Sequence, residues 1–452
     1  MQIPSKILVY SIFIVLVSCR KYLDQKPDQS MTLINKVEDC QALLDNSYYV
    51  NNLDVAAGEA SADDYFVTDD LWASFQLEDR NLYIWNPDNL FPSFGYNGND
   101  WSHTYDNVNR ANMVLEALNH IKITPTSASN WNDVRGQALV LRGRSFLQGL
   151  ITWSLAYDKS TASSDLGIPL RLSSDFNEPT KRASVEDGYN QVIQDLRNAI
   201  DLLPVVPEHP FRASKPAACA LLARTYLAMR LYDSCFKYAD EALSLNHTLI
   251  DYNQLSTDPF SMELFNPEIV MADAMAYSDP VAPWYGKIDT ILYASYDNKD
   301  LRKSVWFGDN GDGTFYFQNS YSQYSLFTGV ANDEVYLMRA ECYARMNNIS
   351  KAMEDLNALM ITRWKNDGSF LPFQASTAQE ALSTILRERR KELVFRGLRW
   401  LDIKRLNKEG ENITLQRVIN GKLYTLPPND LRYALAIPDE IIGLSGIPQN
   451  PR

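Results

Sequence analysis

The sequence predicts a mostly α-helical protein in which helical hairpins form a scaffold and a large irregular lobe contains few short strands. Three pairs of apolar-periodic segments predict the hairpins, and two aromatic-rich stretches without helical periodicity predict the lobe. A helical hairpin buries one face internally and needs a neighbour to cover the other face, so such hairpins occur in series. We therefore expect a helical-repeat scaffold with large insertions.

The clearest hairpin is Lys215–Leu245, where a short polar break separates two apolar-periodic runs. Its spacing of large, small and aromatic residues is typical of a tetratricopeptide repeat and is carried by Leu222, Ala223, Tyr226, Cys235, Ala239 and Ala242. Asp333–Arg363 repeats this spacing. A looser copy pairs Val134–Tyr157 with Ser184–Leu203, and a long excursion over residues 158–183 separates its two helices.

Three further helices are predicted at Met31–Val50, Asp100–Ile121 and Thr377–Val394. The last one continues into Arg387–Arg405, where aromatic and apolar residues alternate with charged ones. This pattern predicts two helices that meet at Gly397 and share buried ion pairs. The candidate pairs join Glu392 or Asp402 to Arg389, Arg390 or Arg399.

The two aromatic insertions are Ala57–Trp101 and Pro280–Phe327. The first is too apolar for a disordered linker, and insertions on repeat scaffolds usually carry the binding surface. Within the second, Asp309–Gly313 lacks the alternate acidic ligands and the closing Glu of a calcium loop, which favours a tight hairpin turn. Asn266–Val270 is an expected strand, and the proline-punctuated tail after Tyr424 is expected to be extended.

The composition narrows the class of partner. The chain of 452 residues carries a formal net charge of −13, which argues against nucleic acid or an anionic membrane surface as the main partner. It contains 25 Tyr and 9 Trp, side chains that a sugar- or peptide-binding surface uses, although a helical core also consumes aromatic residues. We expect most of them to be core.

An enzyme is the less favoured alternative. The acid pairs Asp63-Asp64 and Asp69-Asp70 are imaginable as the carboxylates of a secreted glycoside hydrolase, but adjacent acids in a loop carry no spacing information. The four His are isolated, and the sequence lacks the HExxH, GxSxG and phosphate-loop motifs. We therefore predict a protein that is not an enzyme.

The amino terminus predicts export. Lys6 precedes an apolar run too short to span a bilayer, and the run ends in Leu16-Val17-Ser18-Cys19, which resembles the bacterial lipobox. Residues 1–18 are expected to be a lipoprotein signal peptide, Cys19 the lipidated residue, and 19–30 a flexible leader. A plain signal peptide or an uncleaved anchor is the alternative. The membrane is then contacted through the lipid anchor only.

The other cysteines, Cys40, Cys219, Cys235 and Cys342, each lie in a helix-like apolar pattern. They show no CxxC spacing and do not cluster with His, so we predict no metal site and no cofactor. A disulfide between Cys219 and Cys235 is conceivable in an exported protein. Free, buried thiols are favoured.

Together these features resemble the SusD/RagB-like outer-membrane nutrient-binding lipoproteins of Bacteroidetes. The resemblance rests on the lipobox, the leader Tyr22–Pro27, the repeat helices, and the segments ERRKELVFRGLRWLDIKR, NPEIV and LPPNDLRYALAIPDE. It covers essentially the whole chain. It implies an N-terminal helical region over 31–250 and a C-terminal region over 251–452, each with one of the aromatic insertions.

The resemblance implies a non-catalytic, lipid-anchored protein on the outer membrane, facing outward. Such a protein binds a glycan and delivers it to a SusC-type TonB-dependent transporter; the repeats contact the transporter and the ligand binds in the irregular lobe. The alternatives are a peptide-binding import lipoprotein of the same type and a pure scaffold that holds a protein without a small ligand.

Aromatic rings stack on the apolar faces of sugars while polar groups bond the hydroxyls, so the two insertions supply the candidate ligand residues. The predicted ligand-binding residues are Asp64, Trp72, Tyr83, Trp85, Tyr96, Asn97, Trp101, Trp284, Tyr285, Arg302 and Trp306.

Overall fold

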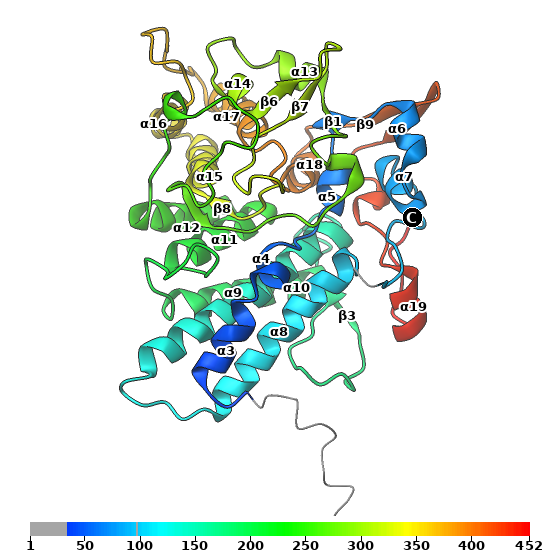
Figure 1. Cartoon of the computed structure of the whole chain (residues 1–452), viewed down its shortest axis with the longest axis vertical. Helices are drawn as coiled ribbons and strands as arrows, with labels where there is room; N and C mark the ends of the chain where they lie inside the picture. The colour runs from blue at the N-terminus through cyan, green and yellow to red at the C-terminus, as the bar shows by residue number, and fades with distance from the viewer. Residues whose placement is uncertain (1–33, 96–97) are drawn as a thin grey trace, which may run out of the picture.

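The computed structural model describes residues 34–95 and 98–452 (Figure 1). Its scaffold is a stack of helices in which each packs on its neighbour along the chain. The stack comprises α8 (Asp100–His120), α9 (Ala128–Trp153), α10 (Val185–Ile200), α11 (Lys215–Ala228), α12 (Tyr232–Leu245), α15 (Asn332–Arg345), α16 (Ile349–Met360) and α17 (Ala378–Glu392). The three predicted hairpins are confirmed as α9–α10, α11–α12 and α15–α16, and the fold is mostly helical as expected.

The small residues of the hairpins permit this close packing. Ala223 and Ala239 face the interior of the α11–α12 hairpin and are fully buried. Ser214 caps α11 by accepting a hydrogen bond from the backbone N–H of Ala217. The α11–α12 and α15–α16 turns each pass through a residue in the left-handed region, Arg230 (φ 59°) and Asn347 (φ 60°).

The N-terminal helix is shorter than predicted. The described part of Met31–Val50 contains α3 (Val37–Leu44) and α4 (Ser47–Asn51) instead of one helix, and α3 lies along α8 (Figure 1). The helix is interrupted at Asp45 and Asn46, whose short polar side chains compete with helical backbone hydrogen bonds. Asp45 instead accepts a hydrogen bond from Gln41 and pairs with Arg212.

The predicted corner at Gly397 is present, with φ at +70° between α17 and α18 (Arg399–Asn407). Of the candidate ion pairs, Arg389 with Asp402 is confirmed at 2.8 Å. The other arginines pair elsewhere, because the N-terminal insertion lies against this corner: Arg390 binds Asp64 at 2.8 Å and Arg399 binds Asp63 at 2.6 Å.

The two aromatic insertions meet in one antiparallel sheet of order β1-β5-β7-β6. β1 (Tyr65–Phe66) comes from the first insertion, and β5 (Lys287–Ile288), β6 (Phe307–Asp309) and β7 (Phe315–Phe317) come from the second. Asp309–Gly313 is the hairpin turn between β6 and β7, as predicted. The short helices around the sheet are α5 (Ala57–Ser61), α6 (Asp69–Ser74), α7 (Leu77–Tyr83), α13 (Thr290–Ala294) and α14 (Arg302–Trp306), with the 3₁₀ turns η1 (Tyr252–Gln254) and η2 (Asp279–Val281).

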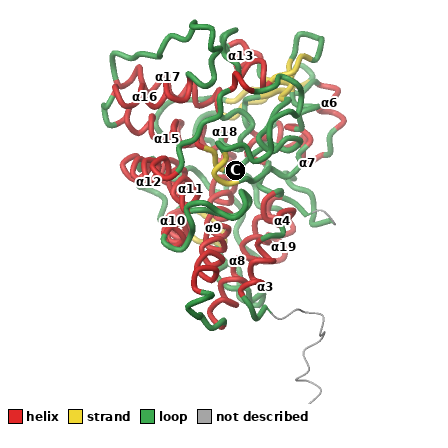
Figure 2. The backbone as a smooth tube through the Cα atoms, turned by 60° about the vertical axis from the view of Figure 1, so that its left-hand side comes forward, coloured by secondary structure: helices red, strands yellow, loops and turns green. Residues whose placement is uncertain are grey.

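The remaining strands are short and lie among loops, as Figure 2 shows in yellow and green. The expected strand is β4 (Ile269–Met271), which pairs with β8 (Val330–Ala331), while β2 (Leu166–Pro169) pairs with β3 (Arg182–Ser184). A hairpin that the sequence analysis did not include joins β9 (Leu415–Ile419) to β10 (Lys422–Leu426). The tail then contains η3 (Leu431–Tyr433) and α19 (Asp439–Ser445) between extended segments.

Candidate functional site

Six of the predicted ligand residues lie in the core, which corrects that part of the prediction. They are at most 4% exposed: Asp64, Tyr83, Trp85, Trp101, Arg302 and Trp306. Each has protein partners that explain its type, so ligand contact is not needed to account for it. Tyr96, Asn97, Cys19, the signal peptide 1–18 and the leader 19–30 lie outside the described residues.

Two of the buried aromatics surround a buried arginine from the C-terminal hairpin. The guanidinium of Arg417 lies 3.5 Å from the ring centre of Tyr83 and 5.0 Å from that of Trp85. Arg417 also donates to the carbonyl of Tyr83, and the indole N–H of Trp85 donates to the carbonyl of Ser61 at 2.9 Å. Cation–π contact and satisfied polar groups make this cluster structural.

The buried charged residues belong to ion-pair networks. Arg302 binds Asp300 and Glu388 at 2.6 Å and Glu392 at 2.9 Å. In the described part of the chain, one group of three carboxylates lies close enough together to hold a metal ion, namely Glu268, Asp333 and Glu392. Arginines already pair with each of them, Arg363 with Glu268 and Glu392, and Arg396 with Asp333.

The exposed aromatic residues of the lobe form a different surface. Tyr277 is 65% exposed and Trp284 is 57% exposed, and their rings lie nearly parallel, with centroids 6.0 Å apart and planes at 23°. Tyr285 follows edge-on to Trp284 and also contacts Phe75, which is buried behind it. We call Tyr277, Trp284 and Tyr285 the aromatic platform. The first insertion supports the platform from behind through Phe75, which lies just after α6.

The platform is held by extended backbone on one side and a tight turn on the other. The chain at Ala274–Ala276 pairs with Asn51–Asp54, through hydrogen bonds from the N–H of Asp54 to the carbonyl of Ala274 and from the N–H of Ala276 to the carbonyl of Asp54. Pro280 is the second residue of η2, and the N–H of Tyr285 donates to the carbonyl of Ala282. These bonds hold the backbone of the segment that carries the rings.

Carboxyl groups border the platform. The Tyr277 hydroxyl donates a 2.6 Å hydrogen bond to Asp279, which orients both groups. Burial raises the pKa of Asp79 to about 7, and the carboxylates of Asp279 and Glu78 raise it further. Asp79 lies on α7 in the first insertion and Asp279 on η2 at the start of the second, so the contact of α7 with η2 brings these two carboxyl groups together.

Of the sequence-predicted residues, Trp284 and Tyr285 are therefore in the platform, and Trp72 is half-buried on the neighbouring α6. The indole N–H of Trp72 donates to the carbonyl of Arg80, whose guanidinium lies 5.7 Å from the ring centre. The sequence analysis missed Tyr277 and Asp79. The signal for Tyr277 was an aromatic residue directly before Ser-Asp-Pro, a turn sequence that exposes its neighbours.

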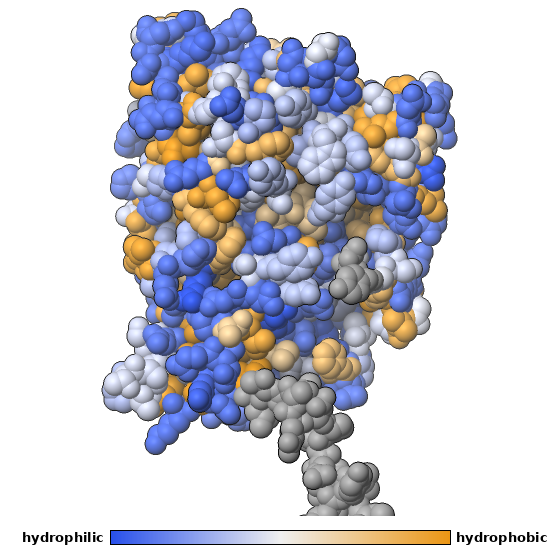
Figure 3. Space-filling view, viewed as in Figure 1, coloured by the Kyte–Doolittle hydropathy of each residue, from blue (hydrophilic) through white to orange (hydrophobic). Residues whose placement is uncertain are grey.

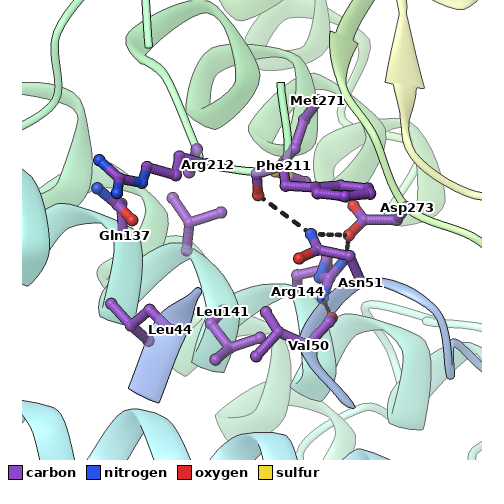
Figure 4. A pocket seen from close by; sticks show the side chains of 12 residues that line it. Leu44, Val50, Asn51, Gln137, Leu141, Arg144, Phe211, Arg212, Met271 and Asp273 are labelled. Carbon is purple, nitrogen blue, oxygen red and sulfur yellow. Dashed lines mark hydrogen bonds and ion pairs between the residues drawn. The ribbon is translucent and has the colours of Figure 1, made fainter. Parts of the chain in front are cut away.

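A small cavity lies where the N-terminal helices α3 and α4 meet α9 (Figure 4). Asn51 donates to Asp273 at 2.8 Å and to the carbonyl of Phe211 at 3.1 Å, and Arg144 pairs with Asp273. The cavity measures about 30 Å³, which is room for a water molecule and far too little for a sugar. This polar cluster anchors the Ala274–Ala276 segment that leads into Tyr277.

On the face shown in Figure 3, hydrophobic side chains are scattered among hydrophilic ones instead of forming one continuous patch. Within residues 34–95 and 98–452, no helix combines the length and apolar character that a bilayer crossing requires.

Two family models match the chain. One, described as "Starch-binding associating with outer membrane", matches residues 21–227, and one described as "SusD family" matches residues 334–434. Neither description names a catalytic activity. No curated protein sequence matches significantly.

Solved structures of the same fold cover nearly the whole chain. A SusD superfamily protein from Bacteroides thetaiotaomicron is 24% identical, with a TM-score of 0.73 over 92% of this chain and 100% of that one. A SusD-like carbohydrate-binding protein from Bacteroides vulgatus is 19% identical, with a TM-score of 0.68 over 91% and 96%. A laminarin-binding SusD-like protein is 17% identical, with a TM-score of 0.67 over 92% and 99%. The family models together match more than half of the sequence, the shared fold covers 92% of the chain, and the chain belongs to the SusD family.

Proposed function

We propose that this protein is a non-catalytic, lipid-anchored glycan-binding protein of the cell surface that delivers its ligand to a SusC-type TonB-dependent transporter. The observation that carries the proposal is the exposed, nearly parallel pair of Tyr277 and Trp284 beside hydrogen-bonding carboxyl groups. Membership of the SusD family and the fold shared with a laminarin-binding SusD-like protein support it.

The platform has the chemistry of a glycan site. Each ring offers an apolar face to the C–H groups of a sugar, while Asp279 and Asp79 accept hydrogen bonds from its hydroxyls. Because the two rings are exposed and their planes are nearly parallel, they suit an extended chain that passes over the surface better than an enclosed monosaccharide. The prior hydrogen bond from Tyr277 to Asp279 lowers the ordering cost of binding.

The test is a binding screen of residues 20–452 against polysaccharides, oligosaccharides and mixed peptides by affinity electrophoresis and calorimetry. Trp284→Ala is expected to lower the affinity for the glycan by at least about tenfold, the effect of losing one aromatic anchor. Tyr324→Ala is the matched control, because Tyr324 is 69% exposed but lies outside the platform.

Equal losses in the two variants would contradict the assignment of the platform. Binding of peptides without binding of any glycan would show that the ligand is a peptide. Release of new reducing ends from the bound glycan would contradict the non-catalytic role.

We place the transporter contact on the helical scaffold, away from the platform. A polar groove of about 630 Å³ runs between α10 and α12 and is lined by charged and amide side chains that include Arg197, Lys237 and Glu241. Co-purification of the transporter with the lipid-anchored chain, weakened by Lys237→Glu and unchanged by Trp284→Ala, is the expected result. Loss of the transporter with Trp284→Ala alone would place the contact on the lobe instead.

A further inference from the structure

The helices α12 and α15 belong to different hairpins, and three side-chain contacts define how they pack. The guanidinium of Arg345 lies 4.0 Å from the ring centre of Tyr232. The rings of Phe236 and Tyr343 meet with centroids 4.9 Å apart. Arg339 binds Asp240 at 2.8 Å. As the residue number rises along α12, the number of its partner falls along α15, so the two helices are antiparallel.

This register places two cysteines opposite each other. Cys235 precedes Phe236, Cys342 precedes Tyr343, and the contacts of Tyr232 with Arg345 and of Asp240 with Arg339 flank the pair on both sides. Both cysteines are fully buried. The neighbouring Cys235 thiol, together with burial, raises the pKa of Cys342 well above the ordinary value for a thiol, in agreement with the position that the register gives the two residues.

We propose that Cys235 and Cys342 form a dithiol that closes into a disulfide across the α12–α15 interface when the chain folds under oxidising conditions. Two S–H bonds break and one S–S bond forms; two protons and two electrons pass to a disulfide oxidant such as oxidised glutathione, which is reduced to two thiols. The bond would link the hairpins α11–α12 and α15–α16 and constrain the long segment of irregular lobe between them.

The other described cysteines do not offer such a pair. Cys219 lies on α11, and burial and the nearby Glu241 raise its pKa to about 12. Glu241 lies six residues beyond Cys235, about 9 Å along α12, so Cys219 faces a different part of that helix. In the structure the four described cysteines are free and buried, as the sequence favoured, and Cys342 instead of Cys219 lies opposite Cys235.

Burial also sets when the bond can form. Thiol–disulfide exchange requires a thiolate, and burial disfavours the thiolate of Cys342 in the folded protein. The folded dithiol should therefore react slowly with both oxidants and alkylating reagents. The bond forms while the hairpins dock, before water is excluded from their interface.

The experiment unfolds residues 20–452 in urea with a reductant and then refolds the chain in a buffer of reduced and oxidised glutathione. Alkylation under denaturing conditions and mass spectrometry then count the free thiols. Of the four cysteines in these residues, two are expected to be protected, in peptides that contain Cys235 and Cys342. The melting temperature should rise by about 5 °C relative to protein refolded with reductant, because the closed loop restricts the unfolded chain.

Cys235→Ala and Cys342→Ala should each abolish the protected pair, whereas Cys219→Ala and Cys40→Ala are matched controls that should retain it. The alanine variants keep a small apolar group in the interface, and their helicity by circular dichroism confirms folding. Four alkylated thiols in folded wild-type protein from the oxidising buffer would overturn the proposal. So would a protected pair that includes Cys219.

Discussion

The backbone N–H of Gly397 donates a 2.9 Å hydrogen bond to the carboxyl group of Glu59, which is 1% exposed on α5. This bond joins the N-terminal insertion to the left-handed corner between α17 and α18. Burial raises the pKa of Glu59 to about 8, the nearby Asp64 raises it further, and Arg399 opposes the shift. The folded protein therefore holds a proton at this site near neutral pH.

The first prediction concerns the pH dependence that follows. In the unfolded chain Glu59 loses its proton near pH 4.5, so the folded state binds more protons between pH 4.5 and about 8. The contribution of this group to stability is full below pH 4.5 and is lost as pH rises through 8. Glu59→Gln keeps an oxygen acceptor for Gly397 and should remove this loss, on the order of 3 kcal/mol. Urea unfolding of both proteins at pH 5 and 8.5 measures this loss. The same change in unfolding free energy between the two pH values in both proteins would contradict the prediction.

The second prediction concerns ligand charge at the aromatic platform. Because the pKa of Asp79 is raised to about 7, its carboxyl group is protonated at pH 6 and ionised at pH 8, next to Asp279. Affinity for a uronate-containing oligosaccharide, relative to its neutral analogue, should fall about fivefold from pH 6 to pH 8 through repulsion by one added charge. Calorimetry at both pH values measures this ratio. Asp79→Asn should remove the change, and an Asp79→Asn protein with an unchanged ratio would place the titrating group elsewhere.

The helical scaffold could be predicted because its signals are local. The apolar stripe of each helix and the small residues Ala223 and Ala239 lie within one hairpin, where spacing alone indicates which side chains face inward. The antiparallel turn at Asp309–Gly313 was local in the same sense. By contrast, the break of the N-terminal helix at Asp45 depends partly on Arg212, which is distant in sequence.

The candidate site could be predicted only as two stretches of sequence. Whether an aromatic residue is exposed depends on what covers it, and the covering residues are distant in the sequence. Arg417 packs on Tyr83 and Trp85, whereas the ring of Trp284 contacts Tyr277 and Tyr285 of the same loop and stays exposed. Composition alone could not separate these cases. The fact that the two insertions share a sheet also depends on pairing of Tyr65 with Ile288, far apart in the chain.

The third prediction concerns the buried ion pairs. Arg302 is fully buried and pairs with Asp300, Glu388 and Glu392. Its removal leaves these three buried carboxylates with only Lys391 and Arg363 as their paired cations. Arg302→Met should lower the free energy of unfolding by about 4 kcal/mol.

The matched control for Arg302→Met is Lys351→Met, because the ion pair of Lys351 with Glu354 at 2.8 Å is largely exposed. Its removal should leave the free energy of unfolding close to that of the wild-type protein, because solvent screens an exposed ion pair. Urea unfolding at pH 7 compares the two variants. Similar small losses in both would show that Arg302 is not needed to hold its carboxylates in the fold.

The fourth prediction concerns the β9–β10 hairpin, whose turn is Asn420-Gly421 with φ values of 50° and 74°. An Asn-Gly pair between apolar-alternating segments is a strong hairpin signal, because both residues tolerate positive φ. Gly421→Ala should lower stability by about 1 kcal/mol through backbone strain alone, since its Cβ would meet no atom within 4 Å. Gly443→Ala is the control: Gly443 lies in α19 with equally open space and no positive φ, so alanine there should raise stability by roughly 0.5 kcal/mol. The urea midpoints of the two variants should shift in opposite directions. Lower stability in both variants would contradict the argument that the positive φ of Gly421 causes the loss.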